Sequence, residues 1–163
     1  MAFLGCVVQA EKLRYIVKTR GIELMSLTLG IIKPDAVQSG KAGNILAHLE
    51  ASGFTVEALR MIRMNTVQAG AFYFVHKERP FFDSLVSFMT SGAVIPMLLE
   101  AEDAVKKLRT VIGATDPVEA DEGTVRRLFA ESKERNAIHA SDSDENAAPE
   151  IAFFFSGHER LDL

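Results

Sequence analysis

The chain has 163 residues, 48% of them hydrophobic and 25% charged, which suffices for one buried core and indicates a single domain. Its formal net charge of −4 argues against a nucleic-acid binder, and no apolar run approaches the roughly 20 residues that a membrane-spanning helix needs. The single cysteine, Cys6, excludes an internal disulfide and favours a reducing compartment, so we predict a cytoplasmic protein without a membrane partner.

The first 24 residues differ from the rest of the chain because they show no clear strand alternation and carry four basic residues. We therefore predict an N-terminal appendage over residues 1–24 and one domain over residues 25–163. Met25 stands just before the first convincing strand, and one hypothesis is that it is the natural initiator.

The first half of the domain shows a strand, a helix and a second strand. Apolar and polar residues alternate over residues 27–31, which predicts a strand that ends in residues 32–35. Residues 43–52 carry apolar residues at helical spacing, and Gly53 suits the end of that helix. Residues 54–64 are rich in β-formers with interleaved charges, which is typical of a strand with one exposed face.

The middle of the chain continues with helices around a buried strand. Residues 66–88 are helical in tendency but are broken at Pro80, so we predict two short helices. Residues 93–99 form a continuous apolar run typical of a buried strand, although Pro96 within it cannot donate to a ladder and has no explanation at this level. Residues 102–109 place acids first and bases last, which favours a helix.

The C-terminal part alternates loop and short elements. A loop over residues 112–123 precedes a short helix capped by Thr124. A brief apolar piece follows at residues 137–138. Residues 141–144 are a cluster of capping residues, and a last helix is predicted to run through residues 150–155. Pro149 costs a helical hydrogen bond there, and we expect it to shift the start of this helix.

His139 is the most informative single residue. It follows the short apolar piece, and the small residues after it leave its ring accessible. Imidazole has an unperturbed pKa near ~6.5, so much of it is neutral and nucleophilic at neutral pH. Glu150 on the last helix is placed to hydrogen-bond the other ring nitrogen and to stabilise positive charge during attack on phosphorus. A lone histidine of this kind is more often an ordinary strand-end residue.

Several cationic and hydroxyl side chains change that interpretation. Phosphoryl transfer needs cations and donors around the moving group, because negative charge spreads over its oxygens in the transition state. Arg109 ends a predicted helix, Thr115 lies in the loop beyond, and Arg126 lies in the first turn of the next helix. Together with Lys33 they are expected to face one pocket.

Five segments carry a resemblance to a known family. They read IKPD (residues 32–35), HKERPFF (76–82), GATDP (113–117), GTVR (123–126) and NAIHASDS (136–143). In this order and spacing they resemble a nucleoside diphosphate kinase, and the match runs from about Met25 into the C-terminal region. Together with the βαββαβ order, the resemblance implies a ferredoxin-like α/β sandwich, a four-stranded antiparallel sheet with surrounding helices.

The resemblance implies a role for each residue near the transferred phosphate. His139 is then the phosphate acceptor, and Glu150 its hydrogen-bonding support. Tyr73 and Lys33 lie close to the transferred phosphate, and Lys33 also reaches the ribose hydroxyls. His76 matches a phosphate-side histidine that part of the family has.

The rest of the nucleotide is assigned in the same way. Arg109 and Thr115 bind the middle phosphate and Arg126 the terminal one, while Phe81 stacks on the base and Asn136 holds the ribose. Stacking without readout of base edges implies a broad range of nucleoside di- and triphosphates, ATP among them. The resemblance also implies ping-pong transfer, Mg²⁺ carried on the nucleotide phosphates without protein ligands, and a homo-oligomer, either a tetramer or a hexamer.

The sequence departs from the family pattern at a few positions. Lys133 stands where an apolar residue usually packs against the base. Small residues, Ala93 and Ala140, replace a common proline and a common glycine, and Pro149 lies close enough to displace Glu150.

Two alternatives remain open at this level. One is a non-catalytic nucleotide-binding or scaffold protein of the same fold, against which the intact Lys33, Arg109, Arg126 and His139 argue. The other is a metal-dependent hydrolase, whose candidate ligands are His48, His76, His139 and His158. Their spacing matches no ordinary ligand signature.

Overall fold

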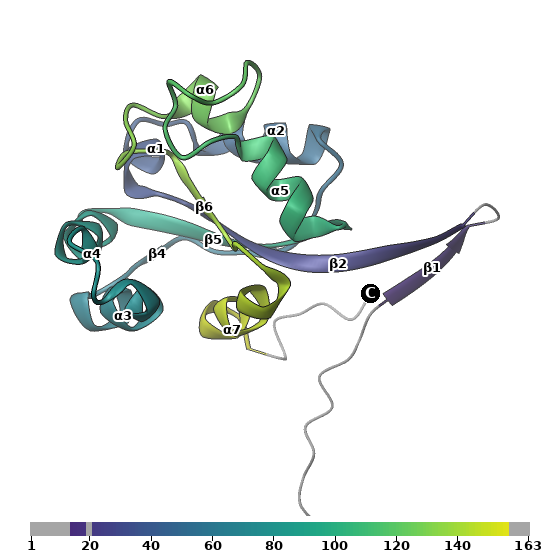
Figure 1. Cartoon of the computed structure of the whole chain (residues 1–163), viewed down its shortest axis with the longest axis horizontal. Helices are drawn as coiled ribbons and strands as arrows, with labels where there is room; N and C mark the ends of the chain where they lie inside the picture. The colour runs from purple at the N-terminus through teal and green to yellow at the C-terminus, as the bar shows by residue number, and fades with distance from the viewer. Residues whose placement is uncertain (1–13, 19–20, 157–163) are drawn as a thin grey trace, which may run out of the picture.

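A computed structural model of the chain describes residues 14–18 and 21–156, which form six strands. Figure 1 shows these strands with the helices around them. The strands are β1 (Arg14–Lys18), β2 (Gly21–Ile32), β3 (Thr55–Leu59), β4 (Ile62–Arg63), β5 (Ala93–Glu102) and β6 (Ile138–Ala140). The helices are α1 (Pro34–Gln38), α2 (Ala42–Ala51), α3 (Thr66–Phe72), the 3-10 turn η1 (Phe74–His76), α4 (Phe82–Thr90), α5 (Ala104–Ile112), α6 (Val125–Phe129) and α7 (Asp144–Phe154).

The sheet is antiparallel throughout and is built around β2 and β5. These two strands pair from Met25 opposite Glu102 to Ile32 opposite Ile95. Strands β3 and β4 pair with β5, whereas β1 and β6 pair with opposite ends of β2. The sequence β2, α2, β3, β5, α5, β6 reproduces the predicted βαββαβ order, so the ferredoxin-like fold is confirmed, with β1 and β4 as additional strands.

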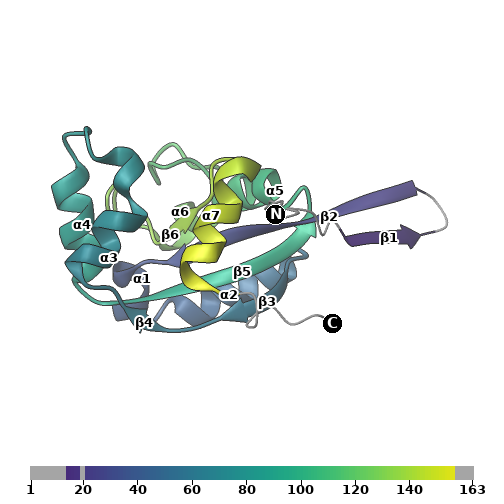
Figure 2. The same ribbon diagram turned by 90° about the horizontal axis from the view of Figure 1, so that it is seen from below.

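Both faces of the sheet are covered, because the side chains of β2 and β5 alternate between two cores. On β5, Met97 and Leu99 face one core while Val94 and Leu98 face the other. The first core is closed by residues of α1, α2, α5 and α6. The second is closed mainly by α3, α4 and α7, and α7 crosses β2 on that face (Figures 1 and 2). The edge of the sheet between the two layers is where the cleft described below opens.

Pro96 in the buried strand β5 is explained by a break in its neighbour. The backbone carbonyl of Pro96 accepts a hydrogen bond from the Arg60 N–H at 3.2 Å, so the missing N–H of Pro96 faces the same side. On that side β3 ends at Leu59 and β4 begins at Ile62. No ladder hydrogen bond is therefore lost, and the single strand predicted over residues 54–64 is two strands for the same reason.

Both ends of the described chain differ from the prediction. The first strand begins at Gly21 and is preceded by β1, although alternation in the sequence is clear only from residue 27. Most of the predicted N-terminal appendage, residues 1–13 and 19–20, lies outside the described residues. The last helix begins at Asp144 rather than Glu150, because Ser143 caps it by accepting from the Asn146 N–H at 3.2 Å.

Pro149 therefore lies inside α7 and does not set the start of the helix. Among the helices that the structure describes, none combines the length and the hydrophobicity that crossing a membrane requires.

Candidate active site

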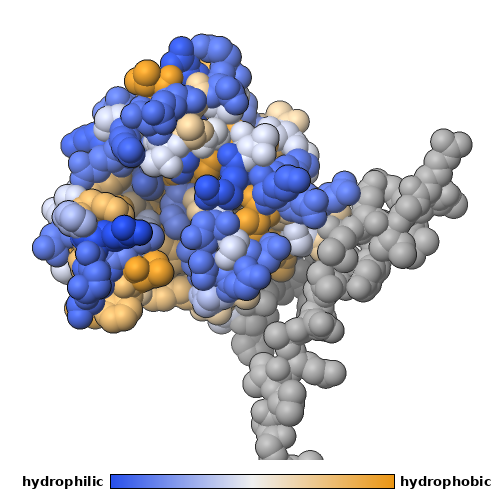
Figure 3. All heavy atoms as spheres, viewed as in Figure 1, coloured by the Kyte–Doolittle hydropathy of each residue, from blue (hydrophilic) through white to orange (hydrophobic). Residues whose placement is uncertain are grey.

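A cleft of about 840 Å³ opens between the α3–α4 region, the loop that follows α5, and the start of α7. The space-filling view of this face is hollowed between these parts, with hydrophilic and hydrophobic side chains around the hollow (Figure 3). All ten residues singled out in the sequence line this one cleft. They are Lys33, Tyr73, His76, Phe81, Arg109, Thr115, Arg126, Asn136, His139 and Glu150.

The short strand β6 delivers His139 to the cleft. Ile138 and Ala140 point into the first core, so the alternation of the strand turns His139 toward the opposite face of the sheet. There the imidazole is partly buried, with the rings of Phe72 and Tyr73 set edge-on at centroid distances of 5.4 and 5.8 Å. These contacts restrict the ring without covering it, because His139 still lines the cleft.

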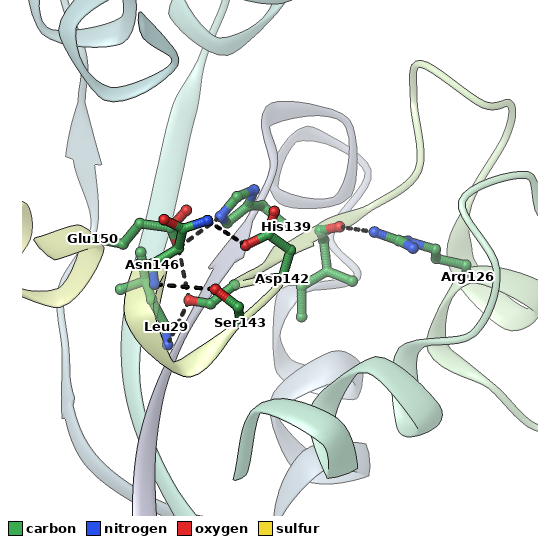
Figure 4. Close-up of polar contacts among 9 residues, drawn as sticks. Leu29, Arg126, His139, Asp142, Ser143, Asn146 and Glu150 are labelled. Atoms are coloured by element: carbon green, nitrogen blue, oxygen red, sulfur yellow. Dashed lines mark hydrogen bonds and ion pairs between the residues drawn. The ribbon is translucent and has the colours of Figure 1, made fainter. Parts of the chain in front are cut away.

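Glu150 on α7 holds one nitrogen of this ring. Its Oε2 lies 3.2 Å from His139 Nε2, and Figure 4 shows the two side chains directed at each other from α7 and β6. A carboxylate only accepts, so Nε2 carries the proton of the neutral ring and Nδ1 is left without one. Pro149 does not displace Glu150, because α7 starts at Asp144, more than one turn before Pro149.

Ser141 is a member of this network that the sequence analysis did not identify. Its hydroxyl donates to Glu150 Oε2 at 2.7 Å and accepts a hydrogen bond from the Leu29 N–H at 3.4 Å. Ser141 therefore fixes the carboxylate that orients His139. The only available signal was its position two residues after the histidine, which places it on the same side of an extended chain.

Lys33 is the most deeply buried cation of the cleft, at 7% exposure. Its Nζ donates to Asn136 Oδ1 at 2.7 Å, and the Asn136 amide donates in turn to the backbone carbonyls of Thr115 and Lys133. Burial, and then the nearby charge of Arg126, lower the pKa of Lys33 from 10.5 to about 8. The charged form of Lys33 thus lacks a full counter-charge.

Arg126 is held in place by two backbone carbonyls. Its guanidinium donates to Gly113 O at 2.9 Å and to Ile138 O at 3.0 Å, next to His139. Burial, and then the charge of Arg109, lowers the pKa of Arg126 to about 10. Lys33, Arg109 and Arg126 therefore repel one another across the cleft, which is the arrangement expected of a site that receives a strongly anionic ligand.

Tyr73 presents a buried hydroxyl beside the histidine. The residue is 3% exposed, and its hydroxyl finds no hydrogen-bond partner among the described residues. Burial raises the pKa of Tyr73 far above its ordinary value, and the negative charge of Glu150 raises it further. The group is therefore a neutral donor under ordinary conditions.

The other end of the cleft is aromatic and more open. Phe81 is 50% exposed, and its ring centroid lies 5.7 Å from that of His76, which stacks at 6.5 Å on Tyr73. Phe82 is partly buried against the second core. Lys133 also lines the cleft. Its backbone carbonyl accepts a hydrogen bond from the Asn136 amide, whereas its side chain is exposed.

The hydrolase alternative is not supported by this geometry. His48 lies on α2, which covers the face of the sheet opposite to His139, and His158 lies outside the described residues. Within residues 14–18 and 21–156, no group of three or more histidine, cysteine or acidic residues is arranged to hold a metal ion.

The fold and the cleft define a class, a ferredoxin-like α/β protein with an oriented histidine among cations. Comparison with known proteins identifies the family. The family model described as nucleoside diphosphate kinase matches residues 26–160. A nucleoside diphosphate kinase of Chlorobium chlorochromatii is 57% identical over 135 residues, which cover 83% of this chain and 96% of that protein. One of Halorhodospira halophila is 58% identical over 132 residues, covering 81% and 94%.

Solved structures agree with the sequence comparison. The Aquifex aeolicus nucleoside diphosphate kinase superposes with a TM-score of 0.83 at 48% identity, covering 84% of this chain and 99% of that one. The Halobacterium salinarum enzyme in complex with CDP gives a TM-score of 0.81 at 38% identity, covering 85% and 92%. The chain belongs to the nucleoside diphosphate kinase family, phosphotransferases that reversibly move the γ-phosphate of a nucleoside triphosphate to a nucleoside diphosphate by a ping-pong mechanism.

Proposed function

We propose that His139 is the residue of this chain that accepts and returns the phosphate. The observation that carries the proposal is the contact between Glu150 and Nε2, which leaves Nδ1 of the neutral ring as the unprotonated nitrogen. In the first half-reaction a bond forms between Nδ1 and the γ-phosphorus, and the bond to the bridging oxygen breaks. The nucleoside diphosphate leaves with that electron pair, and the carboxylate of Glu150 stabilises the positive charge left on the ring.

The second half-reaction reverses these steps with another nucleotide. A terminal oxygen of an incoming nucleoside diphosphate attacks the phosphorus, and the bond from phosphorus to Nδ1 breaks. His139 is returned to its neutral form, and Nε2 keeps its proton throughout. Because donor and acceptor are both phosphoanhydrides, one cleft serves each in turn.

The cations of the cleft are proposed to bind the phosphates. Arg126, fixed beside Ile138, is assigned to the terminal phosphate, and Arg109 with Thr115 to the middle one. Lys33 and the hydroxyl of Tyr73, which has no partner within the described part of the chain, are assigned to the oxygens of the moving group. New hydrogen bonds there compensate their burial. His76 stacks on Tyr73 at the edge of this group and is assigned to the phosphate side.

The nucleoside is assigned to the aromatic end of the cleft. The half-exposed face of Phe81 offers a stacking surface that does not distinguish bases. Asn136 Oδ1 already accepts from Lys33 and keeps a second lone pair, with which it is proposed to accept from a ribose hydroxyl. A broad range of nucleotides, ATP among them, follows from this mode of binding.

Mg²⁺ is proposed to be carried by the nucleotide phosphates and not by protein ligands. Two of the acidic side chains at the cleft are already engaged: Glu150 bonds His139 and Ser141, and Asp142 accepts from the Asn146 amide at 2.7 Å. A Mg²⁺ ion that keeps water and phosphate oxygens as its ligands needs no such cage. When bound, it neutralises phosphate charge alongside the arginines.

The proposal is tested by incubating the protein with ATP labelled in the γ-phosphate. The wild-type protein is expected to carry an acid-labile, base-stable phosphate, and His139→Ala is expected to carry none. His48→Ala is the matched control, because this histidine lies on the opposite face of the sheet, and its labelling is expected to equal wild type. Unlabelled wild-type protein would support the scaffold alternative, and labelling of His139→Ala would reject the assignment.

We further propose a homo-oligomer, either a tetramer or a hexamer, in the cytoplasm. Large apolar side chains are exposed at Leu59, where β3 ends, at Met61 just before β4, and at Val67 in α3. A chain with the single cysteine Cys6 suits a reducing compartment. Light scattering measures the first property, and a monomer at micromolar concentration would contradict it.

A further inference from the structure

A strained backbone turn lies between the two functional residues of the NAIHASDS segment. The Ile138 N–H donates to Asn136 O at 2.8 Å, two residues back, so residues 136–138 form a γ-turn. Its central residue, Ala137, has φ of 66°, a conformation that a residue with a Cβ adopts reluctantly. The turn sets the direction in which Asn136 enters the cleft and the register at which β6 joins β2.

Residues at the start of α1 hold both backbone polar groups of Ala137. The Lys33 N–H donates to Ala137 O at 2.9 Å, and the Ala137 N–H donates to Asp35 Oδ2 at 3.0 Å. Asp35 is 6% exposed, and its other carboxylate oxygen finds no partner among the described residues. A buried carboxylate with one free oxygen is unfavourable. Among the described residues, the contact with Ala137 is the one hydrogen bond of this carboxylate.

We propose that Asp35 is a positioning residue, which holds Ala137 in its strained conformation and thereby sets Asn136 and His139 for phosphoryl transfer. The inference rests on the proposed role of His139. Asp35 bonds Ala137 and not His139, and it does not line the cleft. Without its oxygen, the turn relaxes toward negative φ, and the pairing of Ile31 with His139 loses its fixed register.

The test uses the strain at Ala137, which a change to glycine relieves. Asp35→Ala removes the acceptor, and Ala137→Gly makes a positive φ inexpensive. The readout is the single-turnover rate of His139 phosphorylation by ATP, measured on protein shown by circular dichroism to be folded at the assay temperature. Asp35→Ala is expected to lower this rate at least tenfold, and the double variant Asp35→Ala with Ala137→Gly is expected to recover most of the loss.

Asp35→Asn separates position from charge, because the negative charge of Asp35 also raises the pKa of Lys33. Asparagine keeps an acceptor oxygen, so its rate at pH 7 is expected to lie near wild type. The alkaline limb of its pH profile is expected to move to lower pH, because the lost charge no longer raises the pKa of Lys33. Equal losses in Asp35→Asn and Asp35→Ala, without rescue by Ala137→Gly, would assign the effect to the charge on Lys33 and overturn the proposal.

The chain contains a matched control away from the cleft. The Ala104 N–H donates to Ser26 Oγ at 2.8 Å, and Asp103, the residue before it, has φ of 47°. Ser26→Ala and Asp103→Gly repeat the two changes there, and both are expected to alter Tm without altering the phosphorylation rate.

The remaining outcomes are also decisive. A wild-type rate in Asp35→Ala rejects the inference, whereas absence of phosphorylation in the wild-type protein rejects the proposed function instead.

If Asp35→Ala does not fold, Asp35→Leu with Ala137→Gly is compared with Ala137→Gly alone. A loss of at least tenfold between those two would overturn the proposal, since the relieved turn should no longer need the carboxylate, and similar rates would support it.

Discussion

Nucleotide affinity is predicted to fall as the pH rises from 7 to 9, because Lys33 loses its proton in that range when the cleft is free. Its burial and the charge of Arg126 lower its pKa to about 8. A bound polyphosphate supplies the missing counter-charge and restores the pKa toward 10.5. Binding above pH 8 is then coupled to the uptake of a proton, so affinity decreases as the pH passes the pKa of the free protein.

The size of the effect follows from the two pKa values. With a pKa of about 8, Lys33 is about nine-tenths protonated at pH 7 and about one-tenth protonated at pH 9. With a pKa near 10.5 in the complex, it stays protonated at both. The Kd for a nucleoside diphosphate is therefore expected to rise about tenfold between pH 7 and pH 9, or about 1.4 kcal/mol.

Isothermal titration calorimetry with ADP measures both the Kd and the number of protons taken up. The latter is obtained by repeating the titration in buffers of different ionisation enthalpy. At pH 9 close to one proton is expected, and at pH 7 almost none. Lys33→Met should bind more weakly at pH 7 and show no such pH dependence. A constant Kd from pH 7 to pH 9 without proton uptake in the wild-type protein would refute the reasoning.

Four further predictions follow from the described contacts. Arg109→Ala should lower kcat/KM, with a loss of transition-state stabilisation of roughly 2 to 4 kcal/mol, since it removes a charge from a phosphate pocket. An unchanged kcat/KM in steady-state kinetics would exclude the assignment. Tyr73→Phe should leave Tm unchanged or higher while slowing phosphorylation of His139, because the lost hydroxyl has no partner within the described residues. Ser141→Ala should reduce kcat more than KM in steady-state assays, because Glu150 loses a hydrogen bond that fixes it against His139. Between pH 8 and pH 10.5 the unfolded chain binds more protons at Lys33 than the folded chain, so the free energy of unfolding should rise by up to about 3 kcal/mol. Urea titrations measure this rise, which should be absent from Lys33→Met.

The sequence predicted the order of the elements because most of that information is local. Alternation on β2 and helical spacing on α2 are read within one element. Pro96 was not explained because the answer lies on another strand: the break between Leu59 and Ile62 is what permits a proline in β5. The expectation that Pro149 shifts the start of α7 was wrong, because Ser143, within the predicted cluster of capping residues, caps the helix and Pro149 lies inside it.

The residues of the cleft were found through their resemblance to a known pattern, not through physics alone. Nothing local connects Lys33 with Asn136, or His139 with Arg126, and only the fold brings them together. The supporting residues were missed for the same reason. Ser141 and Asp35 act through a carboxylate and a backbone N–H that lie on other elements. Asp35 carries no signal in its own segment, and Ser141 carries only its position two residues after His139.

The free cleft combines features that are each unfavourable in a folded protein. Lys33 is buried beside Arg126, the hydroxyl of Tyr73 has no partner in the described residues, and Ala137 is held at positive φ. A bound phosphate chain compensates the first two, because it supplies negative charge and acceptor oxygens. The same oxygens are present whether the phosphate is on the nucleotide or on His139. Because these two features are unfavourable only when the cleft is empty, they favour neither half-reaction of the proposed mechanism, as reversible transfer between alike substrates requires.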